Sequence, residues 1–465
     1  MMAPDSPLEF LIAAVAFIVA IGVLVTVHEF GHFWVARKLG IRVLRFSIGF
    51  GPSLWKRTLG KDPVEYMVSV LPLGGYVKLL DEREGNVAPE EASRAFNRQP
   101  VWKRVAVLLA GVVFNLLFAI FVYWVLFTAG VPTLKPVIGE VAADSPAARA
   151  GLKFEDQIVS IAGEPVATLD ETVLLLVRDM VDDGVIEMRV RGVDQAERTA
   201  NIDVGERSRQ LTEPDALFPG LGFDFWRPRV AADVGGFAPD SVGEKAGLRQ
   251  GDEIVKVDGV VIADFGQLQH LIEPAANRLV KLEVRRNGAT LEIPVKVSEQ
   301  VVGERRVGRI GVAPSNRIID SGRTIAEIQT LQQYGPLESV GAATKKTWNK
   351  SIFTLRMLGR MLTGHVSLKA ISGPISIAEL TGYAARQEWR AYLNVLAVIS
   401  ISLAVINLLP IPILDGGQIV FQLAELVKGA PVSERALMLS QQIGMAMMLI
   451  FMTLVFYNDI ARHLN

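Results

Sequence analysis

Four long apolar runs most strongly limit what this chain of 465 residues can fold into. The first is uncharged over 10–27 and the second over 105–134, while the other two occupy 391–414 and 436–458. Each approaches or exceeds the roughly 20 apolar residues that a helix needs to cross a bilayer. We therefore predict a membrane protein with an α-helical core of four transmembrane helices. No Lys or Arg precedes the first run, so we expect a retained span rather than a signal peptide.

The placement of charge predicts the orientation of these spans. Residues 36–104 carry thirteen Lys or Arg and seven Asp or Glu, with basic residues next to both flanking spans. The N-terminus carries Asp5 and Glu9 and no basic residue. Because loops rich in Lys and Arg stay on the cytoplasmic side, we expect both termini and residues 135–389 to lie outside.

The overall charge and the missing cysteines exclude several classes of protein. The formal net charge is −1, whereas a nucleic-acid-binding protein is expected to carry a basic surface. The chain contains no cysteine, which excludes disulfides and thiolate metal sites. Any part that faces an oxidising compartment must therefore rely on its own hydrophobic core.

The region between the second and third runs contains an internal repeat. "DSPAARAGLKFEDQIVSIAG" (144–163) matches "DSVGEKAGLRQGDEIVKVDG" (240–259) at a constant offset of 96 residues. "GLGF" (220–223) follows the first copy, and "RIGV" (309–312) follows the second. The pattern resembles the PDZ domain of the circularly permuted type, in which the Gly-Leu-Gly-Phe strand comes last. We therefore predict two tandem α+β PDZ domains.

The function of these two domains stays open at the level of sequence. PDZ folds bind extended peptides as an added strand, but a spacer or a steric gate that holds no peptide is an equal alternative. After them, residues 339–362 place an apolar stripe on one helical face. This helix is expected either to lie flat on the outer membrane surface or to pack on the second PDZ copy.

The first apolar run ends in "VTVHEFGHFWVAR" (25–37), which places ionisable groups at a position where they are costly. His28 and His32 are four residues apart and therefore share one face of a helix. That spacing allows both imidazoles to bind one Zn²⁺, with Glu29 beside a bound water molecule. The alternative is a buried neutral histidine pair with a protonated glutamate.

A catalytic zinc requires three protein ligands and one open position. The third run ends in "NLLPIPILDGGQ" (407–418), where Asp415 closes an otherwise uncharged segment. Pro410 and Pro412 prevent a regular helix, and the two glycines after Asp415 allow close approach of the backbone. Asp415 is therefore a candidate third ligand, and an ordinary interfacial helix cap is the alternative.

With these motifs the chain resembles the site-2 protease family, the M50-type intramembrane zinc metalloproteases. "HEFGH", "NLLPIPILDGG", four spans and two PDZ copies between spans two and three all match. The resemblance implies that His28, His32 and Asp415 hold Zn²⁺ and that Glu29 is the catalytic glutamate. The family often has Gly-Pro-x-x-Asn in the second span, where this chain has Val112 in place of proline.

The resemblance also implies a biological setting. Family members of this type lie in the bacterial inner membrane, with the PDZ domains in the periplasm and the active site toward the cytoplasm. They cut the transmembrane segment of an anti-sigma factor after a first external cut, which signals envelope stress. Remnant signal peptides are a second class of substrate.

Substrate-binding residues are predicted around the motif. The segment 65–80 resembles the family's membrane-reentrant β-loop, and its Gly74, Gly75 and Tyr76 are expected at the tip of a hairpin. An unwound substrate could add to this loop as a strand. Asn407 and Asn115 are further candidates for holding substrate, and a hydrogen bond between packed helices is the alternative for each.

These assignments divide the chain into predicted segments. They are the first span with its metal motif (8–38), a cytoplasmic loop (39–100) containing the reentrant hairpin (65–80), the second span (101–129), two PDZ domains (130–226 and 227–316), membrane-surface amphipathic helices (335–385), the third span with Asp415 (391–415) and the fourth span (436–458).

Two rival functions use the same residues. A metal transporter needs a polar path across the membrane, but the polar groups cluster near the cytoplasmic side. A peptide-binding scaffold without activity would lack a ligand or the glutamate, and this chain has all of them. The sequence therefore favours a metalloprotease.

Overall fold

The computed structural model describes residues 7–83, 85–213, 216–302, 305–315, 317–319, 325–430 and 432–464. Asp5, which contributed to the predicted orientation, and residue 316, the predicted end of the second PDZ copy, lie outside the described residues. The chain forms two compact units, one from Met1–Pro132 with Leu331–Asp459 and one chiefly from Thr133–Thr330. The chain passes between them through β3 (Val131–Leu134) and β18 (Gln329–Gln332).

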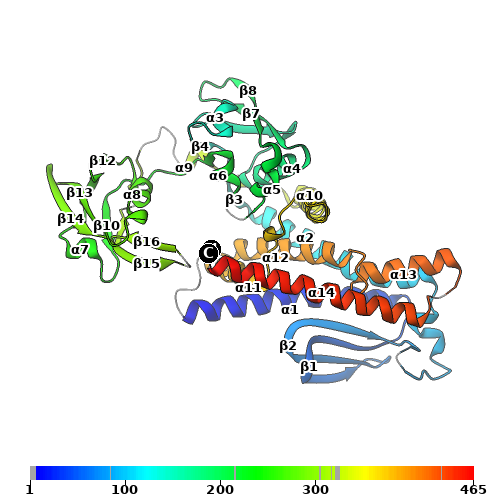
Figure 1. Ribbon diagram of the computed structural model, residues 1–465. Helices are drawn as coiled ribbons and strands as arrows, with labels where there is room; N and C mark the ends of the chain where they lie inside the picture. Colours follow the sequence, from blue (N-terminus) through cyan, green and yellow to red (C-terminus); the bar gives the residue numbers. More distant parts are fainter. Residues whose placement is uncertain are drawn as a thin grey trace. The chain divides into compact units, whose positions relative to one another are not determined.

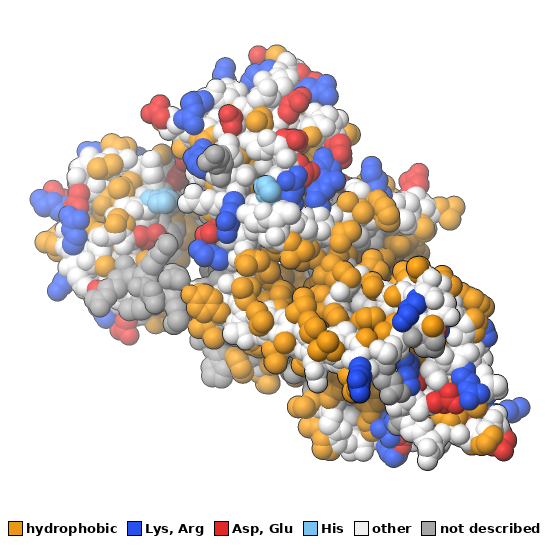
Figure 2. All heavy atoms as spheres, turned by 45° about the vertical axis from the view of Figure 1, so that its right-hand side comes forward, with side chains coloured by type: hydrophobic (Ala, Val, Ile, Leu, Met, Phe, Trp, Pro, Cys, Tyr) orange, Lys and Arg blue, Asp and Glu red, His pale blue; other side chains and the backbone are white. Residues whose placement is uncertain are grey.

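The first unit is built on four helices that are long and apolar enough to cross a membrane, as predicted. They are α1 (Pro7–Lys38), α2 (Val101–Ala129), α12 (Trp389–Asn407) and α14 (Glu434–Leu464), which run alongside one another in Figure 1. Hydrophobic side chains gather over the face of this unit that Figure 2 shows. Exposed apolar side chains of this kind are expected to face lipid. Examples are Leu11, Val15, Val19, Leu117, Phe121, Leu449 and Ile450.

The third predicted span, 391–415, is divided in the structure, which corrects its boundary. Helix α12 ends at Asn407, and a separate helix, α13 (Asp415–Lys428), begins at Asp415. The prolines in the connecting segment, Pro410 and Pro412, lack a backbone N–H and prevent a continuous helix. Asp415 is therefore the first residue of a new helix.

Strands β1 (Val43–Leu59) and β2 (Val64–Leu79) form one antiparallel sheet. The hairpin predicted within 65–80 is wrong in two respects. Its two arms do not pair with each other, and Gly75 and Tyr76, expected at its tip, lie in the second arm opposite Ile48 and Ser47. Both arms pair with the first half of β1: Phe46 lies opposite both Tyr66 and Val77, and Ile48 opposite both Val68 and Gly75. The strands on either side of the Leu71–Gly74 bend are thus separated by β1. The alternation of the sequence did not reveal that β1 inserts between them.

Two further helices cover the four-helix core. Helix α10 (Pro336–Leu362) buries Ser339, Ala343 and Thr347 and packs on α2 and α12. Its apolar stripe, which includes Trp348 and Leu362, remains exposed. Its position on a membrane surface stays a prediction. Helix α11 (Pro374–Gln387) packs on α1, where Gly382 lies against Ala13.

The second unit contains two modules with the same topology. Each has a four-stranded sheet, in the order β6-β5-β7-β8 and β12-β11-β13-β14, and a two-stranded sheet, β4-β9 or β10-β17. The elements of the first are β4 (Ile138–Val141), α3 (Pro146–Arg149), β5 (Gln157–Ile161), β6 (Glu164–Pro165), α4 (Leu169–Asp183), β7 (Val185–Arg191), β8 (Glu197–Asp203), α5 (Ser208–Leu211), α6 (Leu217–Leu221) and β9 (Phe223–Phe225). Those of the second are β10 (Val234–Phe237), α7 (Val242–Lys245), β11 (Glu253–Val257), β12 (Val260–Val261), α8 (Phe265–Ile272), β13 (Leu279–Arg286), β14 (Ala289–Lys296), β15 (Ser298–Val302), β16 (Arg305–Arg309) and β17 (Val312–Pro314), after which α9 (Ile325–Ile328) follows. This match confirms the two PDZ-like α+β copies.

The trailing strand of each copy closes on the start of the same copy, as expected for the permuted PDZ type. Gly222 and Gly311 precede these strands with positive φ and lie against Ser145 and Ser241, which cap helices α3 and α7. A side chain at either glycine would collide with the serine. The repeated serine thus joins the helix cap to the trailing strand in both copies.

A repeated aspartate stabilises each copy from within. Asp252 is 1% exposed and accepts hydrogen bonds from Arg286 and from the backbone N–H of Arg249. Burial alone would raise the pKa of Asp252, but these donors hold that pKa below its ordinary value. The equivalent Asp156 is paired with Arg198 in the first copy. Each aspartate thus ties the helix turn to the sheet.

Candidate metal centre

Three predicted ligands come together inside the first unit. Nε2 of His28 and Nε2 of His32 lie 3.2 Å apart, and they lie 3.2 and 3.4 Å from Oδ2 of Asp415. His28 is buried, and the other two are half-buried. Helix α1 supplies both histidines one turn apart, while Asp415 arrives from the start of α13, almost 400 residues later in the chain.

The size of this triangle matches a zinc site. Three ligands of a tetrahedral zinc at about 2.0–2.1 Å from the metal are separated by about 3.3–3.4 Å. The three atoms in this structure are all electron-pair donors in the forms that bind metal. Within the described residues, Asp415 Oδ2 is buried without a hydrogen-bond partner. Three lone pairs this close together repel one another unless a cation lies between them. The three residues therefore fit a zinc ion.

The far side of each imidazole is held by helix α2. Nδ1 of His32 lies 2.7 Å from the carbonyl oxygen of Val107. A carbonyl can only accept, so Nδ1 carries the proton and the Nε2 lone pair faces Asp415. Nδ1 of His28 lies 3.2 Å from the side-chain amide of fully buried Asn115. The facing atom is the amide nitrogen Nδ2, while Oδ1 is buried without a partner among the described residues. We therefore assign the amide turned by 180°, so that Oδ1 accepts a hydrogen bond from Nδ1 and directs the second Nε2 lone pair inward.

Gly111 of α2 allows this close approach. A Cβ atom at Gly111 would lie 2.5 Å from Nε2 of His32 and 2.6 Å from Cε1 of His28. These separations are far shorter than the ordinary contact distance of about 3.5–4.0 Å. The second span therefore forms a wall against both imidazoles only because residue 111 has no side chain.

The position of Asp415 is fixed by the turn before it and by an ion pair behind it. Side chains at Gly416 or Gly417 would collide with the backbone carbonyls of Leu408 and Ile411. Further along α13, Glu425 accepts hydrogen bonds of 2.5 and 3.0 Å from Arg104 of α2. The Arg104 guanidinium holds the pKa of Glu425 below its ordinary value. Helix α13 is thus attached to the same helix that supports the histidines.

Glu29 projects from α1 between the two histidines. Its side chain is half-buried and lies against Gly75 of β2, where a Cβ would be 3.2 Å from Cγ of Glu29. Its carboxylate is close enough to interact electrostatically with both imidazoles and with Asp415. Glu29 therefore lies beside the ligand triangle, with the backbone of β2 on its other side.

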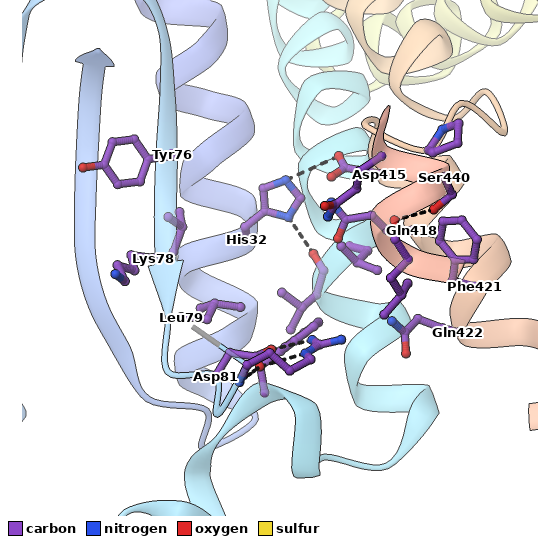
Figure 3. Close-up of a pocket in the computed structure, with 18 of the residues that line it drawn as sticks. His32, Tyr76, Lys78, Leu79, Asp81, Asp415, Gln418, Phe421, Gln422 and Ser440 are labelled. Atoms are coloured by element: carbon purple, nitrogen blue, oxygen red, sulfur yellow. Dashed lines mark hydrogen bonds and ion pairs between the residues drawn. The ribbon is translucent and has the colours of Figure 1, made fainter. Parts of the chain in front are cut away.

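A cavity of about 880 Å³ opens from this cluster. His32 and Asp415 line it, and Figure 3 places Tyr76, Lys78 and Leu79 of β2 on the side opposite Gln418 and Gln422 of α13. Its walls come from α1, β2, α2, α13 and α14. The volume is large enough to admit a stretch of extended peptide.

Of the predicted substrate-binding residues, Tyr76 lines this cavity and the others do not. Tyr76 also stacks on Phe50 and accepts a hydrogen bond from Arg45. Gly74 lies under the Phe50 ring, where any side chain would collide with it. Asn407 is half-buried at the end of α12 and makes none of the contacts described above for the ligand cluster. The burial of Asn115 against His28 supports a positioning role for that residue rather than contact with substrate.

Replacing Asn115 by Leu is expected to weaken zinc binding by about 10–100-fold, because the hydrogen bond that orients His28 is lost. Titration of the metal-free protein with zinc and a competing chelator measures this change. Asn115→Asp, which keeps an acceptor of the same size, is the matched control and is expected to bind zinc more tightly than the leucine variant. Equal zinc affinity in the wild-type and leucine proteins would remove Asn115 from the support of His28.

The sequence analysis did not predict that α13 lines the cavity with polar side chains. The polar positions 415, 418, 422 and 425 are spaced by three and four residues, which is the signal of one helical face. The predicted third span extended to 415 and so concealed that a new helix begins there. The contact of Val107 with His32 uses a backbone carbonyl and leaves no trace in the sequence.

Comparisons with known proteins extend over both units. The profile of Peptidase family M50 matches residues 16–451. The Regulator of sigma-E protease RseP of Escherichia coli (strain K12) is 40% identical over 458 residues, which cover 98% of this chain and 100% of that protein. Protease RseP of Yersinia pestis is 40% identical over 453 residues, covering 96% and 98%. A putative zinc metalloprotease of Vibrio cholerae is 38% identical over 457 residues, covering 96% and 98%.

Proposed function

The chain belongs to Peptidase family M50, and from this premise we propose that it is a zinc-dependent intramembrane protease whose metal is held by His28, His32 and Asp415. The observation that carries the proposal is the ligand triangle, with sides of 3.2–3.4 Å, formed by a membrane-spanning helix and the distant helix α13. Glu29 lies beside it, as proton transfer requires.

The chemistry is divided between the metal and one carboxylate. Zinc bound by the three ligands would lower the pKa of a water molecule toward about 7 and polarise the carbonyl of the scissile bond. Glu29 accepts the proton that the attacking water loses and delivers it to the nitrogen of the leaving amine. Val107 and Asn115 keep both imidazoles in the orientation that this reaction needs.

The substrate class follows from the surroundings of the cluster. The helices that supply the histidines and Gly111 are candidate membrane spans, so a substrate must present its peptide bond at membrane depth. The peptide bonds of a transmembrane helix are protected by its own hydrogen bonds and must be unwound before attack. We expect Gly75–Leu79 of β2, which pairs on one side with Val43–Ile48, to receive the unwound peptide as an added strand.

The relatives suggest the pathway. Those from Escherichia coli and Yersinia pestis are named as RseP, the former as a regulator of sigma-E protease. We propose that this chain likewise cuts the membrane span of an anti-sigma factor, and remnant signal peptides, in a bacterial inner membrane. The two PDZ copies and both termini are then periplasmic, and the site faces the cytoplasm, as the basic residues of 36–104 predict.

One experiment tests the proposed function. The purified protein in detergent is incubated with a single-span test substrate, and the products are identified by mass spectrometry. We expect one or a few cuts within the apolar segment, abolished by a zinc chelator and restored by added zinc. Intact substrate under every condition would contradict the proposal. Zinc flux into proteoliposomes without cleavage would favour the transporter alternative.

A further inference from the structure

Helix α13 presents a row of polar side chains to the cavity, and the proposed chemistry uses only its first member. Asp415, Gln418 and Gln422 follow one another along one face, spaced by three and four residues. All three line the cavity. On the other side, Ile419 packs against the core that contains Val107, so the rotation of α13 is fixed.

The side chain of Gln422 is buried beside the cavity. It is only 8% exposed, yet within the described residues its Oε1 is buried without a hydrogen bond. A buried amide oxygen without a hydrogen-bond partner destabilises the fold. Because this side chain lines the cavity, a ligand there is the natural source of the missing donor. Gln418, one turn closer to the metal centre, is exposed to the same space.

The opposite wall of the cavity is a strand. Tyr76, Lys78 and Leu79 lie across from Gln418 and Gln422 in Figure 3. A peptide that adds to this strand satisfies the backbone groups of every second residue. The groups of the alternate residues point away from the strand, toward α13. In a cavity at membrane depth these groups also need partners.

We propose, on the basis of the proposed function, that Gln418 and Gln422 bind the outward backbone groups of the unwound substrate, so that the peptide is held between β2 and α13. Residues four apart on a helix have Cβ atoms about 5–6 Å apart, and outward groups on a strand repeat every 6.6–6.8 Å or so. The two spacings are close enough for flexible glutamine side chains to bridge. Each glutamine amide offers one donor and one acceptor function, which matches the N–H and C=O of a peptide.

This arrangement explains how the enzyme could select an extended peptide without recognising a particular amino-acid sequence. Amide-to-backbone bonds are indifferent to substrate side chains, which suits an enzyme that must accept different apolar segments. Only an unwound peptide exposes these groups, because a helical peptide uses them internally. The two glutamines thus favour binding of the extended conformation that can be cut.

The test uses the full-length protein and a synthetic single-span peptide whose cleavage site has been mapped with the wild-type enzyme. The Gln422→Leu variant is expected to lower kcat/KM about tenfold, mainly through KM, because it removes binding to the peptide backbone. Gln418→Leu is expected to act in the same direction. Gln442→Leu, the same substitution at an exposed position that does not line the cavity, is the matched control and should have no effect.

Peptides with a single amide replaced by an ester test whether Gln422 binds the substrate backbone or only supports the fold. Replacing one amide by an ester removes an N–H donor, and the wild-type rate should fall both where that N–H bonds β2 and where it bonds α13. At one of these positions the ester should cost the Gln422→Leu enzyme nothing further. If the ester and the variant act additively at every position, or if the variant cleaves like the wild type, the inference is overturned. If the wild-type enzyme shows no metal-dependent cleavage, the proposed function itself fails.

Discussion

Glu29→Gln is expected to lower the rate of peptide cleavage by a factor of about 10²–10⁴, the usual contribution of a positioned general base and acid. The amide has the size and polarity of the carboxylate but cannot accept the proton that the attacking water loses. Since Glu29 is not part of the ligand triangle, zinc content should be unchanged. Single-turnover cleavage of a test substrate, together with the metal content of the same preparation, measures both effects.

The control for this prediction is an acidic residue outside the cluster. Glu338→Gln changes an exposed carboxylate of α10 that does not line the cavity, so it should leave activity unchanged. A Glu29→Gln enzyme that cleaves as fast as the wild type would remove Glu29 from the proton transfer. Loss of zinc together with activity would instead assign Glu29 to metal binding.

Gly111→Ala is expected to have the second large effect, a fall in kcat/KM of about 100-fold, because a misplacement of about 1 Å at a reacting centre has that cost. The new methyl group would lie 2.5 Å from Nε2 of His32 and 2.6 Å from Cε1 of His28. Either helix α2 or the imidazoles must move, and ligand distances tolerate shifts of only about 0.2 Å. Cleavage kinetics and zinc titration measure the loss.

The chain offers a matched control for this substitution. Gly22 also lies within a membrane-spanning helix, but a Cβ there meets no atom within 4 Å. Gly22→Ala should therefore retain activity and zinc, and alanine is the better helix former. Similar losses in both variants would show that any alanine in these spans is harmful and would remove the special role of Gly111.

The sequence predicted much of the fold because its signals are strong and local. Four apolar runs, one repeat with an offset of 96 residues and the trailing glycine strands identified the spans and the two PDZ-like copies. What the sequence did not reveal depends on pairing between distant segments. A turn was predicted at Gly74–Tyr76, whereas the bend lies at Leu71–Gly74, and nothing local shows that β1 lies between the two arms of β2.

The site divides in the same way. His28, Glu29 and His32 lie within about one helical turn. Asp415 could be predicted because it is a charged residue at the end of a long uncharged segment. The short distances between the two histidines and Asp415 are known only from the structure. The roles of Gly111 and Val107 could not be predicted, since an absent side chain and a backbone carbonyl act through position alone.

The most direct test of the central claim is X-ray absorption at the zinc edge of the purified protein, compared between the wild type and Asp415→Ala. The account predicts one zinc per chain with two imidazole nitrogens and at least one oxygen at about 2.0–2.1 Å, and loss of tightly bound zinc in the variant. A wild-type protein without zinc, or an Asp415→Ala protein with an unchanged zinc spectrum, would contradict it.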